Sequence, residues 1–222
     1  MVEPRPALPH RAAFARHLVI MAKSPRAGRV KRRLATSLGP AAAAQVYRTS
    51  LAHTLRRLGW SPRWRTVLAI TPDADKTARL WSHVAPPQGI GRLPQGEGDL
   101  GRRMQRLFAC LPPGPAIIIG SDIPAVRACH IAEAFRLLAA HDAVLGPAHD
   151  GGFWLIGLRR APRLLAPFGG VRWSSPHTLA DTLANLQGHR VALAATLGDI
   201  DTQDDYCRIR QAAQRLILPV CK

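Results

Sequence analysis

Residues 116–124 read AIIIGSDIP, and this stretch decides how the rest of the chain can fold. Its apolar run is rich in β-branched side chains and too short for a helix, which favours a strand buried on both faces. The run stops at Gly120, and one carboxylate, Asp122, follows two residues later. Ligands of open α/β sheets bind just beyond the carboxyl ends of the strands, where an acidic residue can hold a metal ion against a phosphate. The alternative is that Asp122 caps the helix expected after Pro124.

Short apolar runs and amphipathic segments alternate on both sides of this strand, which is typical of an α/β fold. Further strands are expected at residues 18–21, 65–70, 142–145, 153–158 and 191–193, with one short strand inside 86–98. Helices are expected over residues 29–38, 41–58 and 74–84, from 99, after 124, over 175–186 and after 202. The loop 146–152 is too short for a crossover helix, so the strands that flank it need not both be parallel neighbours.

The length of 222 residues suits one domain with a sizeable core. We expect residues 1–16 to form a loose leader and residues 17–222 to form a single domain. No apolar run approaches about 18 residues, so no transmembrane helix is expected. The leader lacks the apolar core of a secretory signal, and the four cysteines show no metal-binding spacing. We therefore expect a cytoplasmic protein with reduced thiols.

The formal net charge of +17 raises the question of a nucleic-acid partner. Of the 31 basic residues, 27 are arginines, and they are scattered along the chain rather than gathered in one tract. No zinc-finger, RRM or KH pattern is present. We therefore expect no specific nucleic-acid partner, and small anionic ligands match this charge better.

Cations gather around the turn that follows the first expected strand. Residues 23–33 hold two lysines and four arginines around Gly28. Glycine lets a ligand approach the backbone closely, a helix N-terminus offers free N–H groups, and the cations supply charge, which together suit a diphosphate. The pattern is not a Walker A loop, because GxxxxGK[ST] is absent. The alternative is a solvated basic helix face.

Two further clusters are rich in glycine and charge. Residues 95–103 read QGEGDLGRR, which is either a flexible loop with Asp99 as a helix cap or a ligand-facing loop that reads a base or ribose. Residues 150–154 read DGGFW. This is either a hairpin turn whose aromatic residues belong to the core, or a place where Asp150 faces a ligand beside an aromatic wall.

Six short motifs occur in order: KSP at 23–25, QGEGDLG at 95–101, GSDIP at 120–124, GP with DGG at 146–152, WSS at 173–175 and DIDT at 199–202. With this set the chain resembles a bacterial family of GT-A-fold, glycosyltransferase-like proteins. The family is part of the nucleotide-diphospho-sugar transferase superfamily, and some members are linked to arsenosugar biosynthesis. The resemblance covers about residues 17–210, which is nearly the whole chain.

The resemblance implies a single-domain α/β fold, a Rossmann-like sandwich with a mostly parallel central sheet and nucleotide bound over its carboxyl edge. In related folds the loop after the first strand holds phosphates or base, and the Asp on the central strand holds a divalent metal. Here Asp122 would therefore bind Mg²⁺ or Mn²⁺, with Asp201 as the second carboxylate. Both aspartates follow apolar segments and precede expected helices, so a doubly wound sheet can bring them together.

The same resemblance assigns roles to the remaining site residues. The nucleotide would be bound by Lys23, Gly28, Lys31, Arg33, Gln95 and Asp99. Of these, the cations would offset diphosphate charge, and the last two would face the nucleoside. Asp150 would lie beside the acceptor, as a catalytic base or as a hydroxyl ligand.

Two reactions fit these residues. The first is glycosyl transfer from a nucleotide-diphospho-sugar to an acceptor that the sequence does not identify. The second is nucleotidyl transfer from a nucleoside triphosphate, which forms a nucleotide-diphospho-linked sugar or cofactor precursor. It stays open because the central strand ends in SDI and lacks the Asp-x-Asp of many GT-A glycosyltransferases. Both reactions use a metal to offset phosphate charge, and they differ in the bond that breaks. A basic nucleic-acid-binding protein without catalysis is a distant third hypothesis.

Overall fold

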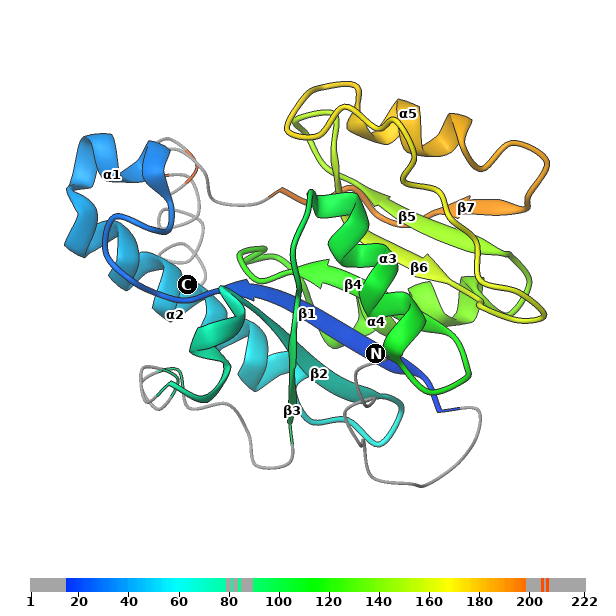
Figure 1. Cartoon of the computed structure of the whole chain (residues 1–222), viewed down its shortest axis with the longest axis horizontal. Helices are drawn as coiled ribbons and strands as arrows, with labels where there is room; N and C mark the ends of the chain where they lie inside the picture. Colours follow the sequence, from blue (N-terminus) through cyan, green and yellow to red (C-terminus); the bar gives the residue numbers. More distant parts are fainter. Residues whose placement is uncertain are drawn as a thin grey trace, which may run out of the picture.

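Seven strands form one sheet in the part of the chain that the computed structural model describes, which is residues 15–78, 81, 84, 90–198, 205 and 207 (Figure 1). The strands are β1 (His17–Lys23), β2 (Arg65–Thr71), β3 (Gly91–Pro94), β4 (Ala116–Gly120), β5 (Ala143–Pro147), β6 (Phe153–Leu158) and β7 (Val191–Leu193). Their order across the sheet is β3-β2-β1-β4-β6-β5-β7. The expected leader lies almost wholly outside the described residues, and the single domain over 17–222 stays a prediction.

The sheet is mostly parallel, as predicted. Only β6 runs antiparallel to its neighbours β4 and β5 among the described strands. β5 and β6 form a hairpin, which agrees with a connecting loop too short for a crossover helix. Because β6 runs against the other strands, its first residues, Phe153 and Trp154, lie at the edge of the sheet where the parallel strands end.

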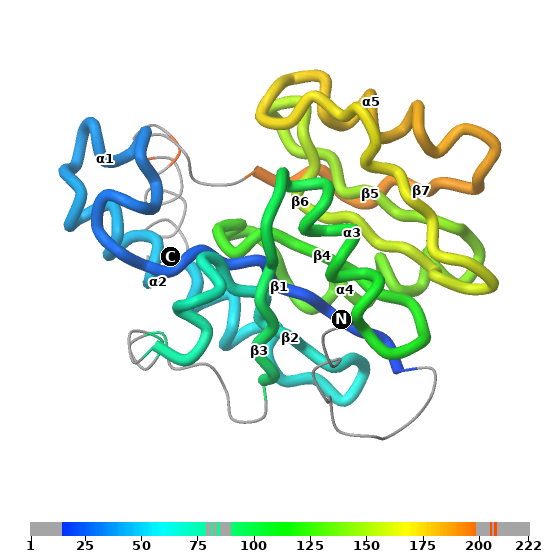
Figure 2. Tube along the Cα trace, viewed as in Figure 1, coloured from blue at the N-terminus to red at the C-terminus, as the bar shows by residue number. Residues whose placement is uncertain are grey.

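The order of the strands reverses at β1. The chain builds β2 and β3 on one side of β1, and β4 then pairs with β1 on the other side, with His17 opposite Ala116 and Met21 opposite Gly120. Such a reversal opens a crevice beyond the carboxyl ends of the two strands, which is where α/β sheets bind ligands. Figure 2 shows the chain leaving β1 and β4 at the same edge of the sheet.

Helices cover both faces of the sheet (Figure 1). They are α1 (Arg32–Leu38), α2 (Pro40–Leu58), α3 (Leu100–Cys110), α4 (Ala128–Leu137), α5 (Thr178–Ala184) and the 3₁₀ helix η1 (Asp73–Thr77). α2 and α4 contribute to one hydrophobic core, whereas α3 and the end of α5 contribute to the other. Strand β4, the stretch with which the sequence analysis began, contributes to both cores, because Ile117 and Ile119 belong to the first core and Ile118 to the second. The expectation of a strand buried on both faces is confirmed.

Three expected helices differ from the prediction, two in where they begin and one in its type and end. α1 begins at Arg32 rather than 29, because Lys31 has a left-handed backbone with φ of 49°. The helix expected over 74–84 begins as η1, and the chain becomes extended at Ala78 with ψ of 143°. α5 begins at Thr178 rather than 175, after a turn closed by Ser175. The expected C-terminal helix lies almost entirely outside the described residues.

None of the helices within the described ranges is both long enough and apolar enough to cross a membrane.

Candidate active site

Two adjoining pockets open beyond the ends of β1 and β4. The larger has a volume of about 590 Å³, and we call it the basic pocket; the smaller, of about 230 Å³, is the acidic pocket. The pockets share four lining residues, which are Leu100, Gly120, Asp122 and Ser174. They therefore adjoin at the crevice that the strand order creates.

Cations dominate the basic pocket. Those that line it are Lys23, Arg29, Lys31, Arg32, Arg33 and Arg103. Lys23 is the last residue of β1, and the others except Arg103 come from the following loop and the start of α1. Lys23, Arg29, Arg32 and Arg33 are exposed to solvent as well as lining the pocket, so the alternative of a solvated basic face stays open. Gly28 has a φ of 74° and makes the turn before Arg29 without lining the pocket itself. Arg26 is less available, because it forms two hydrogen bonds of 3.0 and 2.6 Å to Asp75. The remaining positive charge favours a phosphate-bearing ligand.

Lys31 and Asp122 form an ion pair where the two pockets meet. The left-handed backbone of Lys31 accompanies a side chain that is only 5% exposed, and the Asp122 side chain is 25% exposed. The N-cap of α4 is Arg127, five residues beyond Asp122, so the alternative that Asp122 caps this helix is wrong. Asp122 is instead a carboxylate at the end of β4, beside a largely buried ammonium group.

Tyr47 of α2 ties the end of β1 to the end of β4. Its hydroxyl accepts a hydrogen bond from the backbone N–H of Lys23 (2.8 Å) and shares another with Ser121 Oγ (2.9 Å). Burial, together with the charge of Asp122, raises the pKa of Tyr47 to about 12, so the phenol stays neutral. Sequence reasoning assigned Tyr47 only to the apolar face of a helix, because its polar partners are far away in the sequence.

The loop 95–103 combines structural and pocket-lining roles. The Gln95 side chain is buried, and its Nε2 donates to the backbone oxygens of Ala22 (3.2 Å) and Ala69 (2.9 Å). Both amide hydrogens are therefore used within the fold. Asp99 caps α3 by accepting a hydrogen bond from Arg102 N (2.8 Å), and it also lines the basic pocket. The two interpretations of this loop are thus compatible.

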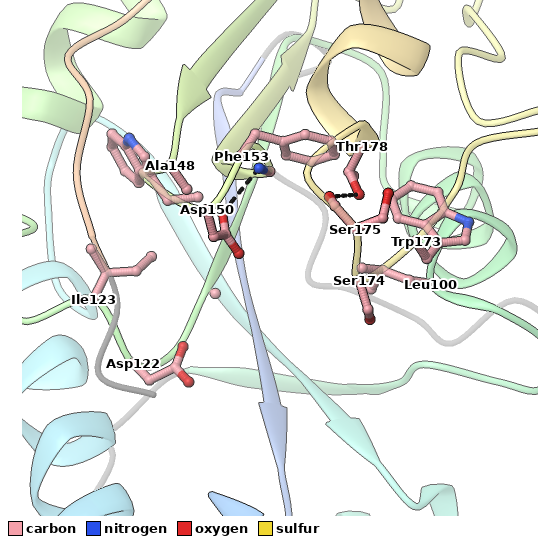
Figure 3. Close-up of a pocket in the computed structure, with 13 residues that line it drawn as sticks. Leu100, Asp122, Ile123, Ala148, Asp150, Phe153, Trp173, Ser174, Ser175 and Thr178 are labelled. Carbon is pink, nitrogen blue, oxygen red and sulfur yellow. Dashed lines mark hydrogen bonds between the residues drawn. The ribbon is translucent and has the colours of Figure 1, made fainter. Parts of the chain in front are cut away.

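Asp150 lies across the acidic pocket, in the loop between β5 and β6. Its Oδ1 accepts a hydrogen bond from Gly152 N (2.9 Å). Gly151 has a φ of 83°, and a Cβ added there would lie 2.3 Å from the backbone oxygen of Pro176. Leu179 N also donates to Gly151 O (3.0 Å). The hairpin loop is thereby held against the turn before α5, and Figure 3 shows the Asp150 carboxylate pointing into the pocket on the side of Asp122.

Aromatic side chains form much of the wall of the acidic pocket. Trp154 is largely buried, as the core interpretation expected, whereas Phe153 meets Trp173 edge to face with ring centroids 6.3 Å apart. Trp173 packs so closely on Gly101 of α3 that a Cβ there would lie 2.6 Å from the ring. Ser174, the next residue, has a φ of 55° and lines both pockets. Backbone strain of this kind clusters at ligand sites.

The second predicted metal ligand, Asp201, lies outside the described residues. Inside them, no group of three or more His, Cys, Asp and Glu side chains gathers as a metal site would require. The structure therefore gives the position of Asp122, in the shared wall of the pockets, and leaves the pairing with Asp201 a prediction.

Several solved structures share this fold. A candidate nucleotide-diphospho-sugar transferase from Desulfovibrio desulfuricans G20 is 27% identical, with a TM-score of 0.81 over 90% of this chain and 88% of that chain. The 4-diphosphocytidyl-2C-methyl-D-erythritol synthase from Anaerococcus prevotii DSM 20548 is 13% identical, with a TM-score of 0.61 over 91% and 97%. Rv0371c from Mycobacterium tuberculosis H37Rv, solved in complex with manganese, is 16% identical, with a TM-score of 0.54 over 90% and 100%. The last two show the fold alone.

The similarity to the Desulfovibrio desulfuricans protein identifies the chain as a transferase. Its fold is that of the nucleotide-diphospho-sugar transferases and cytidylyltransferases. Residues 54–175, more than half of the chain, match a family described as uncharacterized proteins conserved in bacteria, and the chain belongs to that family, DUF2064. No curated protein matches the sequence. The fold class and the bacterial GT-A-like family expected from six motifs are both confirmed.

Proposed function

We propose that this protein is a metal-dependent glycosyltransferase that takes a nucleotide-diphospho-sugar as donor. The observation that carries the proposal is the pairing of a cationic pocket with an acidic one across the shared residue Asp122. A nucleotide sugar has the same division of character, because its diphosphate is anionic and its sugar is neutral and rich in hydroxyl groups. The reacting bond would then lie where the pockets meet.

The nucleotide would lie in the basic pocket. Lys31 and Arg33 would offset the diphosphate charge, with Lys23 beside them and Gly28 making the turn that brings the loop to the phosphates. Hydrogen bonds between cations and phosphate oxygens are among the stronger ones in proteins. Gln95, through its remaining amide oxygen, and Asp99 would face the nucleoside.

The residues at Asp122 fit a divalent cation. Its carboxylate is a hard oxygen ligand of the type that Mg²⁺ and Mn²⁺ prefer. The Lys31 ammonium is paired with this carboxylate, so a bound cation would have to displace it, and Lys31 would then be released toward the phosphates. One or two carboxylates and the substrate phosphates are the usual ligands of Mg²⁺, which Asp122 and Asp201 would supply with the nucleotide. When bound, the ion would offset the charge that develops on the leaving diphosphate.

Asp150 would act on the acceptor as a general base or as a hydroxyl ligand. Its Oδ1 is fixed by Gly152 N, and the carboxylate points into the acidic pocket (Figure 3). A base fixed in this way loses little conformational entropy when it meets its substrate, which favours proton transfer.

Nucleotidyl transfer is the second candidate, because cytidylyltransferases share the fold. The same basic pocket would then bind a nucleoside triphosphate, and a P–O bond would break in place of a glycosidic C–O bond. Nucleic-acid binding without catalysis takes third place, because the arginines are scattered along the chain rather than gathered in one tract.

Ligand-induced stabilisation tests these candidates. We would measure the melting temperature with UDP-, GDP-, ADP- and CDP-sugars and with the nucleoside triphosphates, each with Mn²⁺ and with EDTA. A ligand at 100 times its Kd stabilises a protein by about 2.7 kcal/mol. Stabilisation by one nucleotide sugar with Mn²⁺ is expected; stabilisation by triphosphates alone would favour nucleotidyl transfer. If no nucleotide stabilises the protein, the proposed function is wrong.

A further inference from the structure

The acidic pocket has a charge opposite to that of the chain as a whole. The chain carries 31 Lys and Arg residues against 14 Asp and Glu. Among the described residues that line this pocket, however, there are two carboxylates and no Lys, Arg or His. Lys31 approaches Asp122 from the side of the basic pocket, so Asp150 supplies the uncompensated negative charge. A phosphate or carboxylate on a ligand would be repelled here.

Asp150 has one carboxylate oxygen left to bind a ligand. Oδ1 accepts the hydrogen bond of Gly152 N, and Oδ2 has no hydrogen-bond or ion-pair partner within the part of the chain that the structure describes. An ionised carboxylate only accepts hydrogen bonds, so its complement is a hydroxyl or another donor. The hydroxyls of Ser175 and Thr178 are largely engaged with backbone atoms of their own turn. The ligand must therefore bring the donor to Asp150.

The shape of the pocket limits the ligand further. Its volume of about 230 Å³ admits a molecule of roughly monosaccharide size. Phe153 and Trp173 offer an apolar surface on one side, and Asp150 offers an acceptor on another (Figure 3). A sugar ring or cyclic polyol has the matching character, since its C–H face is apolar and its rim carries hydroxyl donors.

The walls of the pocket are fixed by close packing. There is no space for a side chain at Gly151 against Pro176, or at Gly101 against Trp173. A pocket that is formed before its ligand arrives selects by shape and charge, because little ordering of the protein accompanies binding. Ser174, which lines both pockets, sets the boundary between them.

We propose that the acidic pocket binds the acceptor, and that the acceptor is an uncharged, hydroxyl-rich ring rather than a phosphorylated or carboxylated molecule. The inference rests on the proposed function and deepens it. The acceptor hydroxyl oxygen forms a bond to the anomeric carbon of the donor, and the bond from that carbon to the diphosphate oxygen breaks. The nucleoside diphosphate leaves with the electron pair, and the hydroxyl proton goes to Asp150 Oδ2. Nucleotidyl transfer onto a sugar phosphate would instead place an anion against Asp150.

Matched acceptor pairs test the proposal on the full-length protein. The probes are glucose, mannose, inositol and glycerol, each beside its phosphate ester. Binding is measured by ligand-observed NMR without donor, and transfer is measured with the nucleotide sugar that stabilises the protein. We expect neutral probes to bind and to react at least about tenfold better than their esters. Better binding by the esters would overturn the proposal, whatever the donor results.

Two variants connect the selectivity to the pocket. Asp150→Asn should lower transfer by about 100-fold, as expected for loss of a general base, with donor affinity within about twofold of the wild type. Asp150→Lys should shift binding toward the phosphate esters. Glu133→Gln, which removes a carboxylate paired with Arg136 on the exposed face of α4, is the control and should change neither.

The outcomes distinguish a failure of the proposed function from a failure of the acceptor assignment. If no nucleotide sugar binds or is hydrolysed while neutral probes still saturate the pocket, the proposed function fails and the assignment of the pocket stands. If a donor is hydrolysed but Asp150→Lys leaves the preference between neutral and phosphorylated probes unchanged, the acceptor binds elsewhere and the inference fails.

Discussion

The basic and acidic pockets are in contact, yet they come from opposite halves of the sheet and are built in different ways. The basic pocket takes nearly all its cations from one continuous segment, residues 23–33, beside the parallel strands β1 and β2. The acidic pocket collects its lining from four separate segments around the antiparallel strand β6. The comparison teaches that one local segment can concentrate the positive charge of a pocket, whereas the two carboxylates of the acidic pocket are brought together only by tertiary packing.

This difference predicts that most substitutions will affect one pocket and spare the other. A residue of the shared wall should affect both. The changes below test that division, beginning with the residue for which the largest effect is expected.

Asp122 belongs to both pockets, and Asp122→Asn should therefore have the largest effect. We expect metal-stimulated nucleotide binding to fall by more than about 100-fold, because a hard anionic ligand is lost. The unfolding free energy should also fall, by about 1–3 kcal/mol after allowance for the partial exposure of Asp122, because the buried Lys31 ammonium loses the carboxylate paired with it. Nucleotide affinity with Mn²⁺ and with EDTA, and the melting temperature, measure the two effects.

Two further variants test whether the effects of Asp122→Asn come from the ion pair with Lys31 and from metal binding. Lys31→Met combined with Asp122→Asn should recover part of the lost stability, because both charges of the ion pair are then removed together. Asp201→Asn should reduce metal-stimulated binding in the same way as Asp122→Asn. If Asp122→Asn keeps full stimulation by Mn²⁺, the metal site lies elsewhere and Asp122 is only the counterion of Lys31.

Lys31→Ala tests the basic pocket by itself. The affinity for a nucleoside diphosphate should fall by about 10-fold or more, because charge-assisted hydrogen bonds contribute roughly 1.5–3 kcal/mol. The affinity for the bare nucleoside should change much less. Calorimetry with UDP and uridine makes the comparison, and Lys76→Ala on η1, which lies outside both pockets, is the control. Equal losses for both ligands would mean that Lys31 only supports the fold.

Tyr47→Phe tests the connection between β1 and β4. The variant leaves the Lys23 N–H and the Ser121 hydroxyl without their buried partner, so the unfolding free energy should fall by about 1–2 kcal/mol. Nucleotide affinity should fall modestly as the ends of the two strands loosen, while binding of neutral probes in the acidic pocket should persist. Denaturant unfolding and calorimetry measure the two effects. An unchanged stability would show that the hydroxyl is dispensable.

Asp181→Asn should have the smallest effect, and it should be confined to the acidic pocket. Asp181 accepts hydrogen bonds from Arg172 N, Nε and Nη2 at 2.8–3.0 Å, which holds the start of the turn that carries Trp173 and Ser174. These bonds keep the pKa of Asp181 well below its usual range. Because the folded-state pKa is lowered, the stabilisation is complete above the unfolded pKa of about 3.9 and is lost as pH falls below it.

The matching experiment compares pH profiles of stability for the wild type and Asp181→Asn. The variant should lose the part of the acid-induced destabilisation that this carboxylate causes, and the two profiles should run parallel above about pH 5. Neutral probes should bind more weakly to the variant, with nucleotide affinity unchanged. A loss of nucleotide affinity would show that the two pockets are coupled through this turn.

Much of the sheet could be predicted because each strand carries its own signal. The β-branched run before Gly120 and the short apolar run 191–193 indicated strands without reference to the rest of the chain. The helix from Asp99 was equally local, since a cap and a regular apolar spacing suffice. The start of α1 was misjudged, because the left-handed Lys31 is stabilised by a partner 91 residues away in the sequence.

The residues of the candidate site also divide into those that local motifs could predict and those whose partners are distant in the sequence. Lys31 and Asp122 could be proposed from motifs, and the structure brings them together. The role of Tyr47 could not be foreseen, because a tyrosine at helical spacing indicates core and its bond to Ser121 spans 74 residues. The burial of the Gln95 amide has the same origin, since the carbonyls of Ala22 and Ala69 that accept its hydrogens lie on other strands.

The contact of Gly151 with Pro176 has a consequence for how this enzyme could diversify or be engineered. With 2.3 Å between a prospective Cβ and the proline oxygen, neither loop can grow inward unless the other retreats. New acceptor preferences would therefore arise most easily by paired changes in the hairpin loop and the turn before α5. Transplanting one loop from a relative should fail where transplanting both succeeds, because their non-additive energies arise from direct contact.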